Sequence, residues 1–109
     1  MASYTNQTAF RIPRRSQNPG GINTETIATN KTLVYSDSQY QALTNGTGGS
    51  LNCTLPAEED GAYFWIRNQA GSTGAISVNN PATSGVVSLA AGEAALVVCD
   101  GVWQVFIKA

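Results

Sequence analysis

A run of three acidic residues, Glu58, Glu59 and Asp60, is the densest group of side chains in this sequence that could bind a metal ion. In a turn, adjacent acids point in diverging directions and stay in water. A calcium site would also need several more oxygen ligands at defined spacing. We therefore expect a solvated turn at this position and no metal site.

The two cysteines, Cys53 and Cys99, lie far apart in the sequence. Cys53 shares a strand face with Leu51 and Leu55, so we expect it to be buried and inert. Cys99 precedes an Asp-Gly turn and is expected to be more exposed. No basic neighbour in the sequence would lower its pKa and make it a nucleophile. Synthesis in a reducing cytoplasm favours two free thiols over a bridge between them.

The sequence lacks the motifs that are typical of enzymes. It contains no histidine, which is the commonest general base and metal ligand. It also has no Gly-x-Ser-x-Gly elbow, no phosphate-binding glycine-rich loop and no Cys-x-x-Cys pair. We therefore expect that the protein is not an enzyme, needs no cofactor and works by binding other proteins.

The tryptophans offer another kind of chemistry, because an exposed aromatic ring can stack on a sugar or pack against a protein. Arg67 and Asn68 follow Trp65 closely and could supply hydrogen bonds beside its ring. Core packing is the competing expectation for at least one tryptophan. We expect Phe64 and Trp103 in the core, and we treat Trp65 with Arg67 as a candidate surface aromatic site.

Short strand-like runs, separated by Gly, Asn and Pro turns, must position these side chains. Alternation of residue type is clearest in 51–55 and in 62–68, where Phe64 and Ile66 face one way and Trp65 the other. The remaining expected strands are 32–35, 75–79, 86–89, 93–99 and 102–108. Six or seven short strands predict an all-β protein, either a small β-sandwich or a jelly-roll-like barrel.

Two local patterns add detail to this fold. Asp100-Gly101 is a dipeptide favoured in two-residue type I′ turns, and it predicts a hairpin that pairs Val98 with Trp103. Residues 36–43 begin with side chains suited to capping and predict a short helical turn. The sequence shows no repeat of fixed period.

Residues 1–31 differ from the rest of the chain in both pattern and charge. They have no sustained hydrophobic period, and Pro13 and an Asn-Pro-Gly-Gly run interrupt them. They hold four of the six basic residues and one of the seven acidic residues, so 32–109 is acidic. We therefore expect an extended N-terminal arm over 1–31 and one β-sandwich domain over 32–109.

Charge and hydropathy argue against nucleic-acid and membrane partners. Three arginines in the arm are too few for a nucleic-acid footprint, and the acidic domain would repel phosphate. No segment approaches the roughly 18 apolar residues that a membrane-spanning helix needs. The first residues also lack the apolar stretch of a signal peptide. Charged residues make up 12% of the chain, about half the usual share, which suits broad contact with a protein partner.

A pattern of strands and turns runs from Thr54 to Phe106, about half of the chain. Its segments are Leu55-Pro56, Gly61–Asn68, Ala75–Val78, Leu89–Gly101 and Trp103. This pattern resembles the β-sandwich modules of tailed-bacteriophage virion proteins, which occur in capsid decoration (cement) proteins, head fibres and tail-fibre segments. The size of the chain and its short arm most resemble a capsid decoration protein.

The resemblance implies a structural protein that binds the outer surface of the assembled major capsid protein shell and stabilises it. It also implies a homotrimer on the outer capsid surface of the virion, made in the cytoplasm of the host bacterium. An arm that orders on binding can cover a large area, and its basic charge would favour an acidic capsid surface. The capsid-binding residues that we expect in the arm are Phe10, Ile12, Arg14 and Arg15.

Other roles stay open within the same class of virion proteins. A receptor-binding or glycan-binding module of a head fibre or tail fibre would use Trp65 and Arg67. A head completion or tail-tube protein would instead form a ring of another symmetry.

Overall fold

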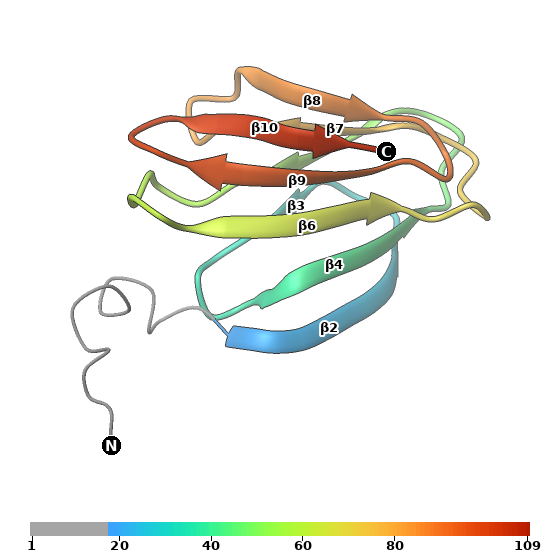
Figure 1. Ribbon diagram of the computed structural model, residues 1–109. Coiled ribbons are helices and arrows are strands. Elements are labelled where there is room, and N and C mark those ends of the chain that lie inside the picture. Colours follow the sequence, from blue (N-terminus) through green and yellow to red (C-terminus); the bar gives the residue numbers. More distant parts are fainter. Residues whose placement is uncertain (1–17) are drawn as a thin grey trace.

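The computed structural model describes residues 18–109, and their side chains from residue 21 onward, as two β-sheets packed face to face (Figure 1). The five-stranded sheet has the order β10-β9-β6-β4-β2, and the four-stranded sheet has the order β3-β5-β7-β8. The strands are β2 (Asn18–Ile27), β3 (Lys31–Thr32), β4 (Ser38–Asn45), β5 (Leu51–Thr54), β6 (Tyr63–Asn68), β7 (Ile76–Asn79), β8 (Gly85–Leu89), β9 (Ala94–Cys99) and β10 (Trp103–Lys108). The expected all-β sandwich is confirmed. No helix in the described part of the chain is long and apolar enough to cross a membrane.

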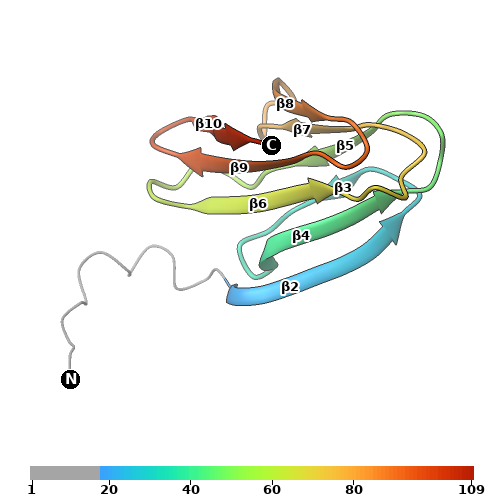
Figure 2. The same cartoon turned by 45° about the vertical axis from the view of Figure 1, so that its right-hand side comes forward.

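From β2 to β7 the chain passes from one sheet to the other at every step, so it winds round the core in three coils (Figure 2). Strands β2, β4 and β6 are therefore parallel neighbours in one sheet, and β3, β5 and β7 are parallel neighbours in the other. Strand β8 then pairs antiparallel with β7, and β9 and β10 complete the larger sheet in antiparallel pairs. This winding resembles the stacking of solenoid coils, in which each coil buries its inner face on the next.

The core lies between the sheets and takes one face of each strand. Phe64 and Ile66 on β6 and Val97 on β9 have no exposed surface, as the alternation of the strands requires. The Phe64 and Trp103 rings lie with their centroids 6.1 Å apart. The indole Nε1 of Trp103 donates a hydrogen bond to the Pro56 carbonyl at 2.8 Å, which satisfies its polar atom inside the core.

A buried asparagine holds one corner where the two sheets meet. The Nδ2 of Asn45, at the end of β4, donates to the Gly49 carbonyl at 2.7 Å and to the Ala75 carbonyl at 2.8 Å, while its Oδ1 accepts from the Thr47 N–H at 2.9 Å. Gly74 completes this corner, because a Cβ there would lie 2.2 Å from the Gly49 oxygen. Successive coils are thus joined by side-chain as well as by ladder hydrogen bonds.

Residues 18–27 and 31–32, which were expected in the N-terminal arm or at its end, are strands of the two sheets. Residues 18–27 form β2, which pairs in parallel with β4, and Lys31 begins β3 in the other sheet. Strand β2 lies at the edge of its sheet, where polar side chains can face solvent. Its Thr and Asn residues are compatible with this position, and Thr also favours strands. Residues 1–17 lie outside the described part of the chain.

Two local expectations are wrong. Residues 36–43 do not form a helical turn, because Gln41 and Leu43 point into the protein as part of β4 and have no exposed surface. In the hairpin, Trp103 pairs with Cys99 and not with Val98. The Asp100 N–H donates to the Val102 carbonyl at 3.1 Å, so the turn is one residue longer than the type I′ pattern predicts. This shift brings Trp103 to the core face.

Candidate functional site

A row of large side chains crosses the outer face of the five-stranded sheet. The alternation that buries Phe64 and Ile66 turns Trp65 outward, and its neighbours in register lie on the same face. The row takes one residue from each strand, in the order Ile22, Tyr40, Trp65, Leu96 and Ile107. Its two ends are the most exposed, with 68% of Ile22 and 46% of Ile107 accessible to solvent.

The outer face is hollowed at the β2 end of this row. The hollow has a volume of about 270 Å³ and is lined by Gly21, Ile22, Gln39, Tyr40, Tyr63 and Trp65. Three aromatic residues, Tyr40, Tyr63 and Trp65, therefore border a site that is open to solvent. Aromatic surfaces of this kind bind protein side chains or the faces of sugar rings.

The structure places the expected surface pair, Trp65 and Arg67, on the same outer face of β6. Both side chains are partly exposed, but the hollow is lined by Trp65 and not by Arg67. The aromatic neighbours of Trp65 are instead Tyr40 and Tyr63. Sequence reasoning missed Tyr40, because only the parallel pairing of β4 with β6 brings it beside Trp65.

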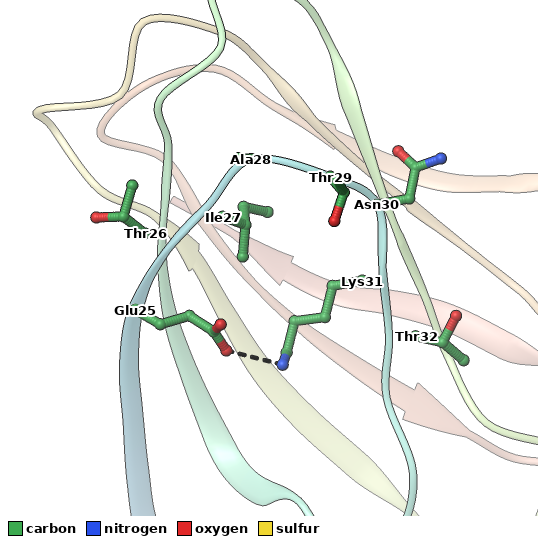
Figure 3. A pocket seen from close by; sticks show the side chains of 8 residues that line it. All are labelled: Glu25, Thr26, Ile27, Ala28, Thr29, Asn30, Lys31 and Thr32. Atoms are coloured by element: carbon green, nitrogen blue, oxygen red, sulfur yellow. Dashed lines mark hydrogen bonds and ion pairs between the residues drawn. The ribbon is translucent and has the colours of Figure 1, made fainter.

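A second hollow, of about 430 Å³, lies at the turn between β2 and β3 and is lined by residues 25–32 (Figure 3). Its charged side chains are already paired. The Lys31 Nζ donates to the Glu25 Oε1 at 2.8 Å, and the Nδ2 of Asn23 donates to the same oxygen at 2.7 Å. The Asn23 amide also donates to the Gln41 Oε1 at 2.8 Å. These contacts join the turn between β2 and β3 to β4, and we name them the polar cap of β2. Since the charged groups of this hollow already bind one another, we do not take it as the candidate ligand site.

The paired charges of this cap change the acidity of Glu25. The hydrogen bond from Lys31, followed by the one from Asn23, lowers the pKa of the Glu25 carboxyl below its ordinary value of 4.5. The ionised carboxylate is the form that accepts both bonds. Glu25 is therefore held as a structural anion at neutral pH.

The acidic turn is linked to the core by the tyrosine beside it. Among residues 18–109, no group of three or more His, Cys, Asp or Glu side chains is placed to hold a metal ion. The Tyr35 hydroxyl donates to the Ala57 carbonyl in this turn. Burial, with a smaller effect from the charge of Glu59, raises the pKa of Tyr35 to about 12. Tyr35 therefore stays protonated and links the turn to the core.

Both cysteines are buried and free. Burial raises the pKa of the Cys53 thiol to about 12, which leaves it uncharged and unreactive at neutral pH. Cys99 has 1% of its surface exposed, in contrast to the more exposed position expected from the sequence. The one-residue shift of the hairpin explains this difference, because it places Cys99 opposite Trp103 on the core face.

The remaining site residues expected from the sequence fall into two groups. Phe64 and Trp103, expected in the core, are 0% and 6% exposed. The expected arm residues lie outside the described part of the chain; they are Phe10, Ile12, Arg14 and Arg15. Comparison with known proteins found no matching family model, no similar curated protein and no similar solved structure. The outer face of the five-stranded sheet is thus the candidate functional site, and it is suited to binding.

Proposed function

We propose that this protein is a capsid decoration protein of a tailed bacteriophage, which binds the outer surface of the assembled major capsid protein shell and stabilises it. The observation that carries the proposal is the row of large side chains across the outer sheet face. No strand among residues 18–109 covers this face, since β3, β5, β7 and β8 all lie on the opposite side (Figure 2). Large apolar and aromatic side chains that are left exposed in this way mark surfaces that bind proteins.

The virion role is supported by the resemblance of residues 54–106 to phage β-sandwich modules. A decoration protein needs no reacting groups, only a surface that recognises the assembled shell. Binding to the assembled state and not to dispersed subunits stabilises the shell by mass action. Many identical copies on one shell multiply a modest effect for each copy.

The basic N-terminal residues would add to this contact. Arg14 and Arg15 bring positive charge, and Phe10 and Ile12 bring apolar groups that a capsid surface could bury. Opposite charges on the two partners increase the rate of encounter more than the final affinity. Under this proposal the arm speeds association, and the outer sheet face supplies the apolar contact.

The proposal is tested by cosedimentation of the purified protein with assembled shells. Replacing Trp65 by Ser should weaken binding at least about tenfold, because a central aromatic residue of an interface typically contributes more than 1 kcal/mol. The matched control is Val34→Ser, since Val34 is 51% exposed but lies outside the row. Equal binding of the two variants would refute the role of the outer face.

Copy number in purified virions tests the role more broadly. Quantitative mass spectrometry against the major capsid protein should give a copy number comparable to that of the capsid protein. A handful of copies for each virion would instead place the protein at the tail or at a vertex and would refute decoration of the shell.

One observation favours a second candidate function, binding of glycans by a fibre module. Tyr40, Tyr63 and Trp65 line the hollow, and exposed aromatic rings can stack on the faces of a sugar. Titration with surface oligosaccharides of the host should then shift the fluorescence of Trp65. A decoration protein would show no such shift and would still bind shells.

A further inference from the structure

Strand β10, at one edge of the five-stranded sheet, exposes three consecutive apolar side chains after its buried first residue, Trp103. The residues from Gln104 to Lys108 are all exposed, including 42% of Val105, 69% of Phe106 and 46% of Ile107. The register against β9 shifts between Val105 and Ile107, which leaves Phe106 without a partner in the register. Exposing three consecutive large apolar residues on an edge strand is unfavourable in water, so burying them against a partner would be favourable.

The opposite edge of the same sheet is built differently. Natural edge strands are protected from pairing with other chains by charged side chains that point inward and by polar residues on the edge. Strand β2 has both features, since Glu25 faces inward with Asn23, and Thr24 and Thr26 face outward. Strand β10 has Lys108 near its end as its charged residue, so Val105, Phe106 and Ile107 lack this protection.

The two ends of β10 carry opposite charge. At its start lies Asp100, and the acidic turn is held beside it by a hydrogen bond of 2.8 Å from the Gly61 N–H to the Cys99 carbonyl. At its end Glu93, which lies 3.4 Å from Lys108, offsets the positive charge of that lysine, so the net charge of this end depends on Arg67 as well. Arg67 adds a further positive charge at that end, because it pairs in register with Ala94.

We propose that β10 is the surface at which a second copy of this chain docks, in an antiparallel, two-fold contact with Phe106 at its centre. In this orientation the acidic start of each β10 meets the basic end of the other. A parallel approach would bring the two acidic turns together. A two-fold contact uses the same surface on both copies and closes at two subunits. It therefore gives a dimer, in contrast to the homotrimer that the resemblance implies, and it does not depend on the capsid role.

The test is the mass of the full-length protein in solution, measured by light scattering over a range of concentrations. The wild-type chain should approach twice its mass of 11.4 kDa as the concentration rises. Phe106→Asp should raise the dissociation constant by more than about 30-fold, which is the effect of losing a central anchor residue. Ile22→Asp is the matched control, because Ile22 is 68% exposed on the other edge, and it should leave the dimer intact.

A charge exchange tests the orientation of the two copies. Lys108→Asp and Asp100→Lys should each weaken the dimer, and the two changes together in one chain should restore it. A wild-type monomer at all concentrations, a trimer, a Phe106→Asp variant that still dimerises, or a double variant without rescue would each overturn the proposal. Circular dichroism establishes that each variant is folded, and the charge exchange gives an independent result if Phe106→Asp does not fold.

Discussion

Strands β2 and β10 are the two edges of one sheet, and Ile22 on β2 and Phe106 on β10 are almost equally exposed, at 68% and 69%. Their surroundings differ. Ile22 is followed by threonines on its own face and borders a hollow, whereas Phe106 lies between two other exposed apolar residues. The exposure of one residue is therefore a poor guide to an interface, and the composition of the strand around it is a better one.

The difference follows from where each strand comes in the winding of the chain. Strand β2 is the first strand of the described residues 18–109, and Asn23, Glu25 and Lys31 are joined by hydrogen bonds at that end of the winding. Strand β10 ends the described chain and is joined to β9 by a tight turn. Trp103 fixes its start in the core, while the residues after it leave the core. Besides its pairing with the neighbouring strand, β2 is thus held by polar contacts and by Ile27 at its end, and β10 is held by one aromatic anchor, Trp103.

The largest effect is expected from replacing Trp103, the residue that anchors β10 in the core. Trp103→Ala should lower the free energy of unfolding by about 3–5 kcal/mol, because it removes a buried aromatic residue and its contact with Phe64. Urea denaturation measures this loss. The control is Val102→Ala, which removes a neighbouring side chain that is 58% exposed and should change stability by less than about 0.5 kcal/mol. Equal effects of the two substitutions would show that Trp103 is not the anchor.

The sequence predicts this anchor and a strand over 102–108, but it does not predict the register of that strand against β9. Trp103 was expected in the core, yet the Asp-Gly turn predicted pairing with Val98, and the longer turn pairs it with Cys99. Gly101, with a φ of 105°, adopts the left-handed conformation that this turn requires. Because strand side chains alternate, an error of one residue in the turn reverses the face of every residue that follows.

The parallel strands were harder to predict than the hairpin. Ile22 lies 18 residues before its partner Tyr40, and Tyr40 lies 25 residues before Trp65, so the coils have no common period. Gln41 is fully buried although it is polar, which hides the strand pattern of β4. The row of side chains on the outer sheet face consequently forms only when the chain folds. Of its five residues, the sequence analysis identified only Trp65 as a candidate site residue.

A smaller effect is expected at the buried end of β2. Ile27 is 5% exposed, and Ile27→Val should cost about 0.5–1.5 kcal/mol, the usual loss for one buried methylene group. If β2 is held mainly by polar contacts, this loss should be well below that of Trp103→Ala. A loss as large as that of Trp103→Ala, measured by the same urea denaturation, would remove the contrast between the two edges.

The polar cap of β2 should make stability depend on pH. Folding lowers the pKa of Glu25, so its contribution is complete above the ordinary value of 4.5 and is lost as the pH falls through the lowered pKa of the folded state. The Glu25 side chain is 39% exposed, so screening by solvent limits this contribution to less than about 1 kcal/mol.

Glu25→Gln should therefore lower the urea midpoint at neutral pH, and the difference from wild type should vanish in acid. Glu93 gives a matched control, because its side chain is 37% exposed, close to the 39% of Glu25, but its ion pair with Lys108 is longer, at 3.4 Å against 2.8 Å for Lys31 and Glu25. Glu93→Gln should change the midpoint less than Glu25→Gln at neutral pH. A difference between wild type and Glu25→Gln that persists in acid would exclude the ion pair as its cause.

The smallest effect on the folded monomer is expected from the two exposed edge residues, and it gives the sharpest comparison. Phe106→Thr and Ile22→Thr should each change the stability of a dilute solution by no more than about 0.5 kcal/mol, since both side chains face solvent. If β10 joins two copies, the wild-type Tm must rise with protein concentration, because the folded dimer is favoured by mass action. Ile22→Thr should keep this dependence on concentration, and Phe106→Thr should lose it. The same dependence in both variants would mean that the two edges are equivalent despite their different composition.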